Sequence, residues 1–213
     1  VGSILRGQCR KNELSWQVEN WTVCYTVDMQ VFILPGGNGR NDGHWYTWVA
    51  RELRRRGFSA QVLGQNKLSP FKRAQQLRNR CSLDRETVLV GHSFGGLTAL
   101  KWLELASQPI AGLILVDASV KAMFEVPQLG KVEKIRQRYL HSWNWKLDLR
   151  RAAKYAGRSA VLSEHRTEKS YLAWKPGQQT FARVLRCRLV SGLGKKQHFT
   201  AKQEPLVLRT VLH

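Results

Sequence analysis

The sequence contains few acidic residues, few cysteines and no long hydrophobic run. Its 213 residues include 15 Asp and Glu against 35 Lys and Arg, and only 4 Cys and 6 Pro. No apolar stretch approaches the ~20 residues that cross a bilayer, which excludes an integral membrane helix and predicts no membrane contact. The cysteines fit neither a zinc motif nor a C-x-x-C redox pair, so we expect free thiols in a reducing, cytoplasmic compartment.

Apolar residues are plentiful. A hydrophobic share of 43% with eight Trp excludes a disordered polymer, and this length is typical of one domain, which we expect over residues 29–213. Two interpretations of the extension 1–28 stay open. It comes from an upstream or incomplete reading frame, or it includes a strand, because apolar and polar residues alternate from Trp21 to Asp28.

The scarcity of acids leaves a formal net charge of +20. Residues 121–213 hold 20 basic and 6 acidic side chains, and therefore carry +14 of it. Such a balance is compatible with a polyanion as partner. No block of five or six like charges and no nucleic-acid-binding motif accompanies it, so we do not expect nucleic acid as the partner.

Strand-like and helix-like segments alternate from Met29 onward. Short apolar runs predict strands at 31–34, 58–63, 87–90, 110–116 and 187–190; helical periodicity predicts a helix from Trp45 that Gly57 ends, helices at 70–80 and 94–106, and a final helix after His198. The run 110–116 is apolar throughout, as in a strand buried on both faces of a parallel sheet. The fold class is therefore α/β, with an open, mostly parallel sheet flanked by helices.

The most informative motif is Gly-His-Ser-Phe-Gly-Gly at residues 91–96, between a predicted strand and a predicted helix. In that context G-x-S-x-G is typical of a nucleophile elbow, where a strained turn lifts the serine hydroxyl above the sheet and the glycines prevent clashes. A glycine-rich turn that contains a serine without a catalytic role is the alternative. We predict that Ser93 is a nucleophile.

An acyl-transfer serine needs N–H donors for the oxyanion. The backbone N–H of Phe94 comes with the elbow. Gly37 and Asn38, in the glycine-rich loop after the first predicted strand, are the candidates for the second donor. A phosphate-binding loop fits less well, because no Lys-Ser or Lys-Thr pair follows.

The serine also needs a base, which in this chain order is a histidine after the acid. Six histidines are present. His198 follows the strand 187–190 and precedes the final helix, so it lies in a loop at the correct end of the sheet and is the best candidate by position. His165 is the alternative, although it lies at a strand end where the acid is expected.

From Met29 onward the chain resembles the small single-domain α/β-hydrolases grouped around retinoblastoma-binding protein nine, a family of serine hydrolases. The matching segments run in family order over about 185 residues: 34–39, 45–49 with 52–53, 90–95, 143–145, 172–175 with 178–179, and 198–199. The paired W-Y-x-W and W-x-W elements are more discriminating than the elbow alone. The resemblance implies that Ser93 is the nucleophile and His198 the base.

The resemblance also predicts where the acid belongs. The family places its catalytic aspartate second in an acidic pair, five residues before the tryptophan that corresponds to Trp174, and Lys169 occupies that position here. Glu168, one residue earlier, matches the first acid of the pair and is our prediction. Glu164 is the second candidate. A glutamate can serve as the third member of such a triad.

Residues 119–157 occupy the place where these folds vary their substrate-covering segment. Trp143 and Trp145 lie there, and either form the wall of an apolar pocket or pack on the sheet. We therefore predict a serine hydrolase that cleaves a small ester or amide through an acyl-enzyme on Ser93 and needs no metal or organic cofactor. The alternative is a catalytically impaired protein with the same fold that binds a partner or polyanion. The oligomeric state cannot be predicted from these residues.

Overall fold

The computed structural model describes residues 14–18, 21–25, 29–36, 45–64, 69–118, 147–163, 177–191, 199 and 201–213. A six-stranded sheet in the order β4-β3-β5-β6-β7-β8 forms its centre. The strands are β3 (Gln30–Leu34), β4 (Ser59–Val62), β5 (Thr87–His92), β6 (Gly112–Val116), β7 (Arg158–Ser163) and β8 (Arg188–Ser191). The helices are α1 (Tyr46–Arg54), α2 (Pro70–Arg78), α3 (Phe94–Glu104), α6 (Leu149–Tyr155) and α8 (Pro205–Leu212), and residues 177–184 are also helical. The predicted α/β class is confirmed.

All five strand pairs in this sheet are parallel. The chain passes from β3 outward to β4 and then returns to β5 on the other side of β3. The direction of strand addition therefore reverses between β3 and β5. In open α/β sheets, ligands bind outside the carboxyl ends of the strands at such a switch point.

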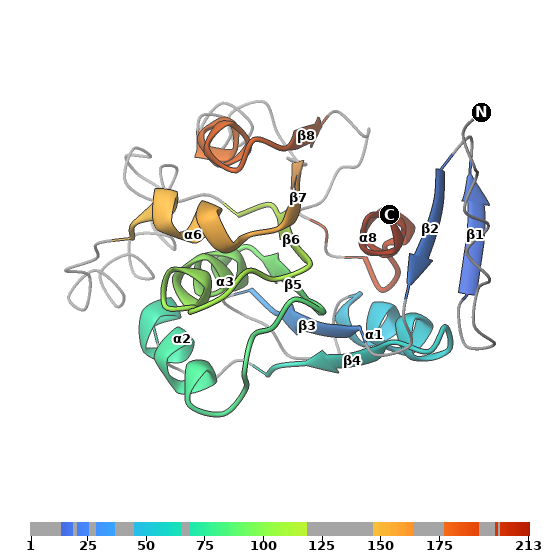
Figure 1. The fold of residues 1–213 in the computed structure, drawn as a ribbon, viewed down its shortest axis with the longest axis horizontal. Helices are drawn as coiled ribbons and strands as arrows, with labels where there is room; N and C mark the ends of the chain where they lie inside the picture. The colour runs from blue at the N-terminus through green and yellow to red at the C-terminus, as the bar shows by residue number, and fades with distance from the viewer. Residues whose placement is uncertain are drawn as a thin grey trace, which may run out of the picture.

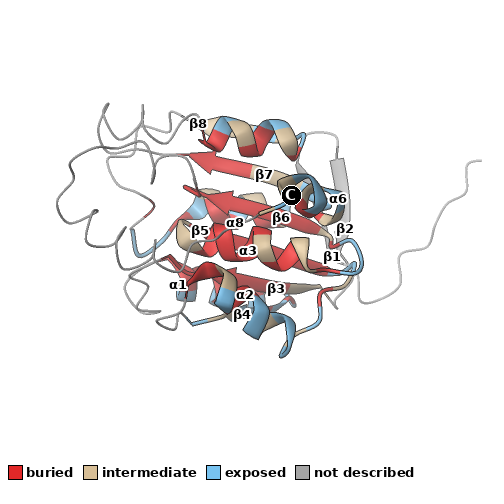
Figure 2. Cartoon of the chain, turned by 90° about the vertical axis from the view of Figure 1, so that its left-hand side faces the viewer, coloured by how far each residue is buried: buried red, intermediate tan, exposed pale blue. Residues whose placement is uncertain are grey.

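Helices cover both faces of the sheet. Figure 1 shows α2, α3 and α6 on one side and α1 and α8 on the other. The core is divided in the same way. Leu100 and Trp102 of α3 belong to one buried cluster, whereas Val49 of α1 and Val207 of α8 belong to the other. Because both faces are covered, β5 and β6 are buried at every position (Figure 2), as the apolar run at 110–116 predicts.

The observed elements differ from the predicted ones by one to two residues at most ends. Strand β5 runs on to His92, because its ladder with β6 continues to the pair His92 and Val116. Helix α1 ends at Arg54, three residues before the glycine that is predicted to end it. Gly57 adopts φ 88°, a left-handed conformation that glycine tolerates and that commonly ends a helix.

The strands β1 (Leu14–Val18) and β2 (Trp21–Tyr25) form a separate, antiparallel two-stranded sheet. This confirms the strand that the alternation from Trp21 predicts. Among the helices that the structure describes, none is long and apolar enough to cross a membrane.

Candidate active site

Ser93 lies at the turn between β5 and α3 with φ 51° and ψ −119°. A positive φ is uncommon for any residue other than glycine and stores strain that the surrounding structure must hold. Two hydrogen bonds hold it here: the Ser93 N–H donates to the carbonyl of Val116 (2.8 Å), and the Gly96 N–H donates to the carbonyl of Ser93 (3.0 Å). The side chain is partly exposed. The strained strand-to-helix turn that the motif predicts is therefore present.

The glycines of the motif are required by close packing. A Cβ added to Gly95 would lie 1.9 Å from the carbonyl oxygen of Leu34, and one added to Gly96 would lie 2.3 Å from Cβ of Ala118. Side chains at these positions would push α3 away from the ends of β3 and β6. The glycines thus allow the N-terminus of α3 to approach the carboxyl edge of the sheet, with Phe94 as its first residue.

The loop that leaves β3 passes directly beside the serine. A Cβ added to Gly36 would lie 3.1 Å from Cβ of Ser93 and 3.2 Å from Nδ1 of His92. Gly36 leads into the loop in which the sequence places the second oxyanion donor. That loop therefore starts next to the serine, at the switch point between β3 and β5.

A buried hydrogen-bond network joins Gly36 to the residue before the serine. The Gly36 N–H donates to the hydroxyl of Tyr46 (3.3 Å), and the same hydroxyl lies 2.5 Å from Nδ1 of His92. Burial raises the pKa of Tyr46 to about 12, so the hydroxyl keeps its proton at neutral pH. Which of the two atoms donates depends on the tautomer of His92. His92 is thus buried and hydrogen-bonded beside the elbow.

Arg73 supports the same peptide unit from the other side. Its guanidinium is 2% exposed and donates to the carbonyls of Pro35 (3.3 Å), Gly64 (3.2 Å) and Leu63. Burial lowers the pKa of Arg73 to about 10. The peptide between Pro35 and Gly36 is thus held at its oxygen by Arg73 and at its N–H by Tyr46. No sequence motif predicts either contact.

The structure also contains a buried acid that the sequence analysis missed. Asp117 directly follows β6, is fully buried, and adopts φ 46°. Its Oδ1 accepts a hydrogen bond from Nε2 of Gln178 (3.3 Å), which is also fully buried. One sequence feature could have identified Asp117: it is an acid placed directly after an apolar strand, where the polar residues of a parallel sheet gather.

Several predicted site residues lie outside the described residues. These are Gly37, Asn38, Trp143, Trp145, Glu164, Glu168 and His198. The structure therefore brings together Ser93, Phe94 and the start of the glycine-rich loop, and does not test the base, the acid or the pocket. Phe199, the neighbour of His198 in the chain, is described and fully buried. Within the described ranges, no group of three or more His, Cys, Asp or Glu side chains could hold a metal ion.

A family model described as "Serine hydrolase" matches residues 31–149, which include the elbow and both strands of the switch point. The chain belongs to the serine hydrolase family. This serine hydrolase is 29% identical to YdeN of Bacillus subtilis over 116 residues, 51% of this chain and 58% of YdeN. It is 25% identical to the serine hydrolase RBBP9 of Rattus norvegicus over 160 residues, 71% of this chain and 78% of that protein. The resemblance found in the sequence is confirmed.

Solved structures agree on the fold of this serine hydrolase. The ydeN gene product of B. subtilis superposes with a TM-score of 0.67 at 20% identity, over 86% of this chain and 97% of that chain. Esterase B of Lactobacillus rhamnosis, solved with a tributyrin phosphonate inhibitor, gives a TM-score of 0.59 at 15% identity, over 88% and 74% of the two chains. At these identities the comparison shows the α/β-hydrolase fold.

Proposed function

We propose that this protein hydrolyses a small ester or amide through an acyl-enzyme on Ser93. The observation that carries the proposal is the backbone of Ser93, which is strained at φ 51° at the carboxyl end of β5 and partly exposed there. A turn of this kind costs free energy and presents the hydroxyl above the sheet, as a nucleophile requires. Membership of the serine hydrolase family supports the same role.

The proposed reaction proceeds in two halves. In the first, Oγ of Ser93 attacks the substrate carbonyl while its proton passes to His198, and the leaving alcohol or amine departs with that proton. In the second, water attacks the acyl-enzyme, His198 takes the proton of the water, and Oγ of Ser93 is released with a proton. The N–H of Phe94, with Gly37 or Asn38, stabilises the oxyanion in both halves.

The imidazole base needs an acid that orients it. Glu168 is the acid that the sequence predicts for this role. Asp117 is a buried carboxylate that follows Val116, whose carbonyl accepts the Ser93 N–H. Trp143 and Trp145 are proposed to form the wall of the substrate pocket. The reaction needs neither a metal ion nor an organic cofactor.

Labelling with a fluorophosphonate tests the proposal directly, because such probes phosphonylate only an activated serine. We expect wild type to be labelled and Ser93→Ala to be unlabelled, with ester turnover lower by about 10⁶-fold. Ser82→Ala removes an exposed serine hydroxyl and serves as the matched control, with unchanged labelling. Folded wild-type protein that does not react would contradict the proposal.

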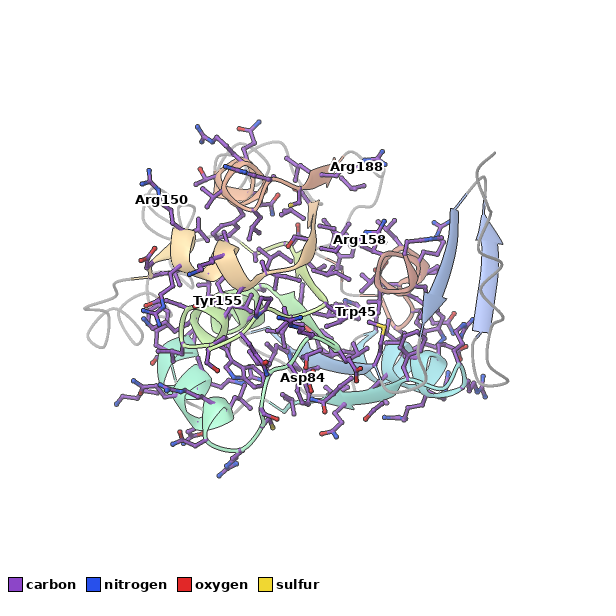
Figure 3. The ribbon with its side chains drawn as sticks, in the orientation of Figure 1. Trp45, Asp84, Arg150, Tyr155, Arg158 and Arg188 are labelled. Carbon is purple, nitrogen blue, oxygen red and sulfur yellow. The ribbon has the colours of Figure 1, made fainter. Side chains whose placement is uncertain are left out.

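The alternative function, binding of a partner or polyanion by a silent hydrolase fold, has less support. Figure 3 shows Arg150, Arg158 and Arg188 at separate places on the molecule, from three different elements. These three side chains, all from the part of the chain that the structure describes, do not gather on one surface. Retention on a polyanion column at physiological salt, by a wild type that the probe does not label, would favour this alternative instead.

A cytoplasmic location is part of the same proposal. Of the four cysteines, the structure describes the side chains of Cys81 and Cys187, and both are free and half-buried. Burial raises the pKa of the Cys187 thiol, which keeps it protonated and unreactive at neutral pH. Free thiols of this kind are typical of proteins from a reducing compartment.

A further inference from the structure

A serine hydrolase needs a carboxylate that orients its base, and the expected position for that carboxylate is occupied by Lys169. The structure contains a carboxylate at a different place on the same edge of the sheet. Asp117 is the residue that directly follows β6. Its position, its burial and its hydrogen bond support this role.

Hydrogen bonds of the backbone fix the position of Asp117. The N–H of Ser93 donates to the carbonyl of Val116, and the N–H of Asp117 donates to the carbonyl of Leu162, each at 2.8 Å. Asp117 therefore lies one strand away from the serine at the carboxyl edge, between β5 and β7. A residue on this edge is within a few ångströms of the crevice where substrate binds in open α/β sheets.

The carboxylate of Asp117 has a buried hydrogen-bond partner. Its Oδ1 accepts from Nε2 of Gln178, which lies on the helix 177–184 that follows β7 in the chain. Both side chains are fully buried. The left-handed backbone of Asp117, at φ 46°, has a steric cost for a residue with a Cβ, and such costs concentrate at functional sites.

The residue that follows the proposed base belongs to the core on one face of the sheet. Phe199, joined to His198 by a peptide bond, is fully buried and belongs to the core cluster that contains Val116 and Leu162. Val116 precedes Asp117, and Leu162 accepts its backbone hydrogen bond. The covalent neighbours of the base and of Asp117 thus share one cluster.

We propose that Asp117, rather than Glu168, orients the histidine base. Its carboxylate accepts a hydrogen bond from the imidazole N–H that faces away from Ser93, and stabilises the imidazolium that forms when Oγ of Ser93 loses its proton. No covalent bond forms to Asp117. Gln178 holds the carboxylate in place. The inference rests on the proposed function, because it needs His198 to act as the base.

Asp117→Asn tests the role, since the amide keeps the shape of the side chain and an oxygen that can accept from Gln178. We expect kcat for an ester substrate to fall about 10³- to 10⁴-fold, with KM within threefold of wild type and an unchanged unfolding midpoint. The rate of fluorophosphonate labelling should fall with kcat. Glu86→Gln removes an exposed carboxylate at the other end of β5 from Ser93 and is the matched control, with kcat within threefold of wild type.

A structural role alone would lower the unfolding midpoint and leave kcat of the folded protein unchanged, and that result would overturn the inference. Loss of kcat in Glu168→Gln instead would also overturn it. A wild type that does not react with the probe overturns the proposed function, whereas a reactive wild type with a fully active Asp117→Asn overturns only the role of Asp117.

If Asp117→Asn does not fold, a second variant tests the same role. Gln178→Met removes the donor to the carboxylate, and we expect about a tenfold lower kcat at unchanged KM. An unchanged kcat would overturn the inference.

Discussion

The hydroxyl of Tyr46 lies 2.5 Å from Nδ1 of His92 and accepts the N–H of Gly36 at 3.3 Å. This contact joins the start of α1 to the ends of β3 and β5. His92 precedes the proposed nucleophile, and Gly36 precedes the loop with the proposed oxyanion donors. One buried hydroxyl therefore contacts both the residue before the proposed nucleophile and the residue before the proposed oxyanion loop.

Tyr46→Phe removes that hydroxyl and keeps the ring in its buried site. We expect kcat to fall about 10- to 100-fold, because a small displacement of the oxyanion loop weakens transition-state binding more than substrate binding. KM should stay within threefold. Steady-state kinetics on an ester substrate provide the measurement. Tyr155→Phe, which removes a hydroxyl on α6, is the matched control, and an equal loss in both variants would contradict the assignment.

The ionisation of Tyr46 predicts a loss of stability at alkaline pH. The pKa of Tyr46 is raised from 10.0 to about 12 in the folded protein, so between these values the unfolded chain has lost the proton that the folded chain keeps. The free energy of unfolding contributed by Tyr46 is therefore complete below pH 10 and falls by about 2 kcal/mol as the pH rises to 12.

Urea unfolding of wild type and Tyr46→Phe at pH 9 to 12 measures this contribution as a difference. Arg73, whose pKa is lowered to about 10, acts in the opposite sense, since its burial cost disappears as it loses its proton. Arg73 is present in both proteins, so the part of its effect that does not depend on its charge interaction with Tyr46 cancels. A difference in unfolding free energy that stays constant over this range would show that Tyr46 is not the group that titrates.

Arg73 is predicted to stabilise the turn after β3 through its three carbonyl contacts. Arg73→Lys keeps the charge but cannot reach three acceptors with one ammonium group, and leaves buried carbonyls unpaired. We expect the free energy of unfolding to fall by about 2–3 kcal/mol. Arg78→Lys, at an exposed position of the same helix, should change it by less than about 0.5 kcal/mol. Equal effects would mean that the buried contacts contribute little.

Gly95→Ala is predicted to disrupt the elbow, because its Cβ would lie 1.9 Å from the backbone oxygen of Leu34. Neither partner is a flexible side chain, so α3 or β3 must shift. We expect about 3 kcal/mol of destabilisation together with loss of fluorophosphonate labelling in the protein that remains folded. Gly64→Ala, at an exposed position, is the control. Normal labelling of Gly95→Ala would mean that the elbow tolerates the side chain.

Local patterns in the sequence were sufficient for the fold. The apolar run at 110–116 predicts β6, and the glycine at position 57 predicts the end of α1. The motif at residues 91–96 predicts the strained serine, since a tight strand-to-helix turn needs glycines at those positions to avoid clashes. These features depend on neighbours in the chain, and a periodic pattern or a single steric requirement is enough to find them.

The contacts that surround the serine could not be found in this way. Tyr46 and His92 are 46 positions apart, Arg73 and Pro35 are 38 apart, and Asp117 and Gln178 are 61 apart. Each pair is joined by the order of strands in the sheet, and no single segment contains both members. The resemblance places the acid after β7 and therefore does not point to Asp117, which follows β6.

The sequence by itself determined the α/β class, the position of the nucleophile elbow and the resemblance to serine hydrolases, because each depends on residue type and short-range spacing. The tertiary structure decided which buried polar groups lie at the carboxyl ends of β3, β5 and β6. Burial explains the difference: Tyr46, Arg73 and Asp117 need hydrogen-bond partners inside the protein, and the packing of distant segments selects those partners.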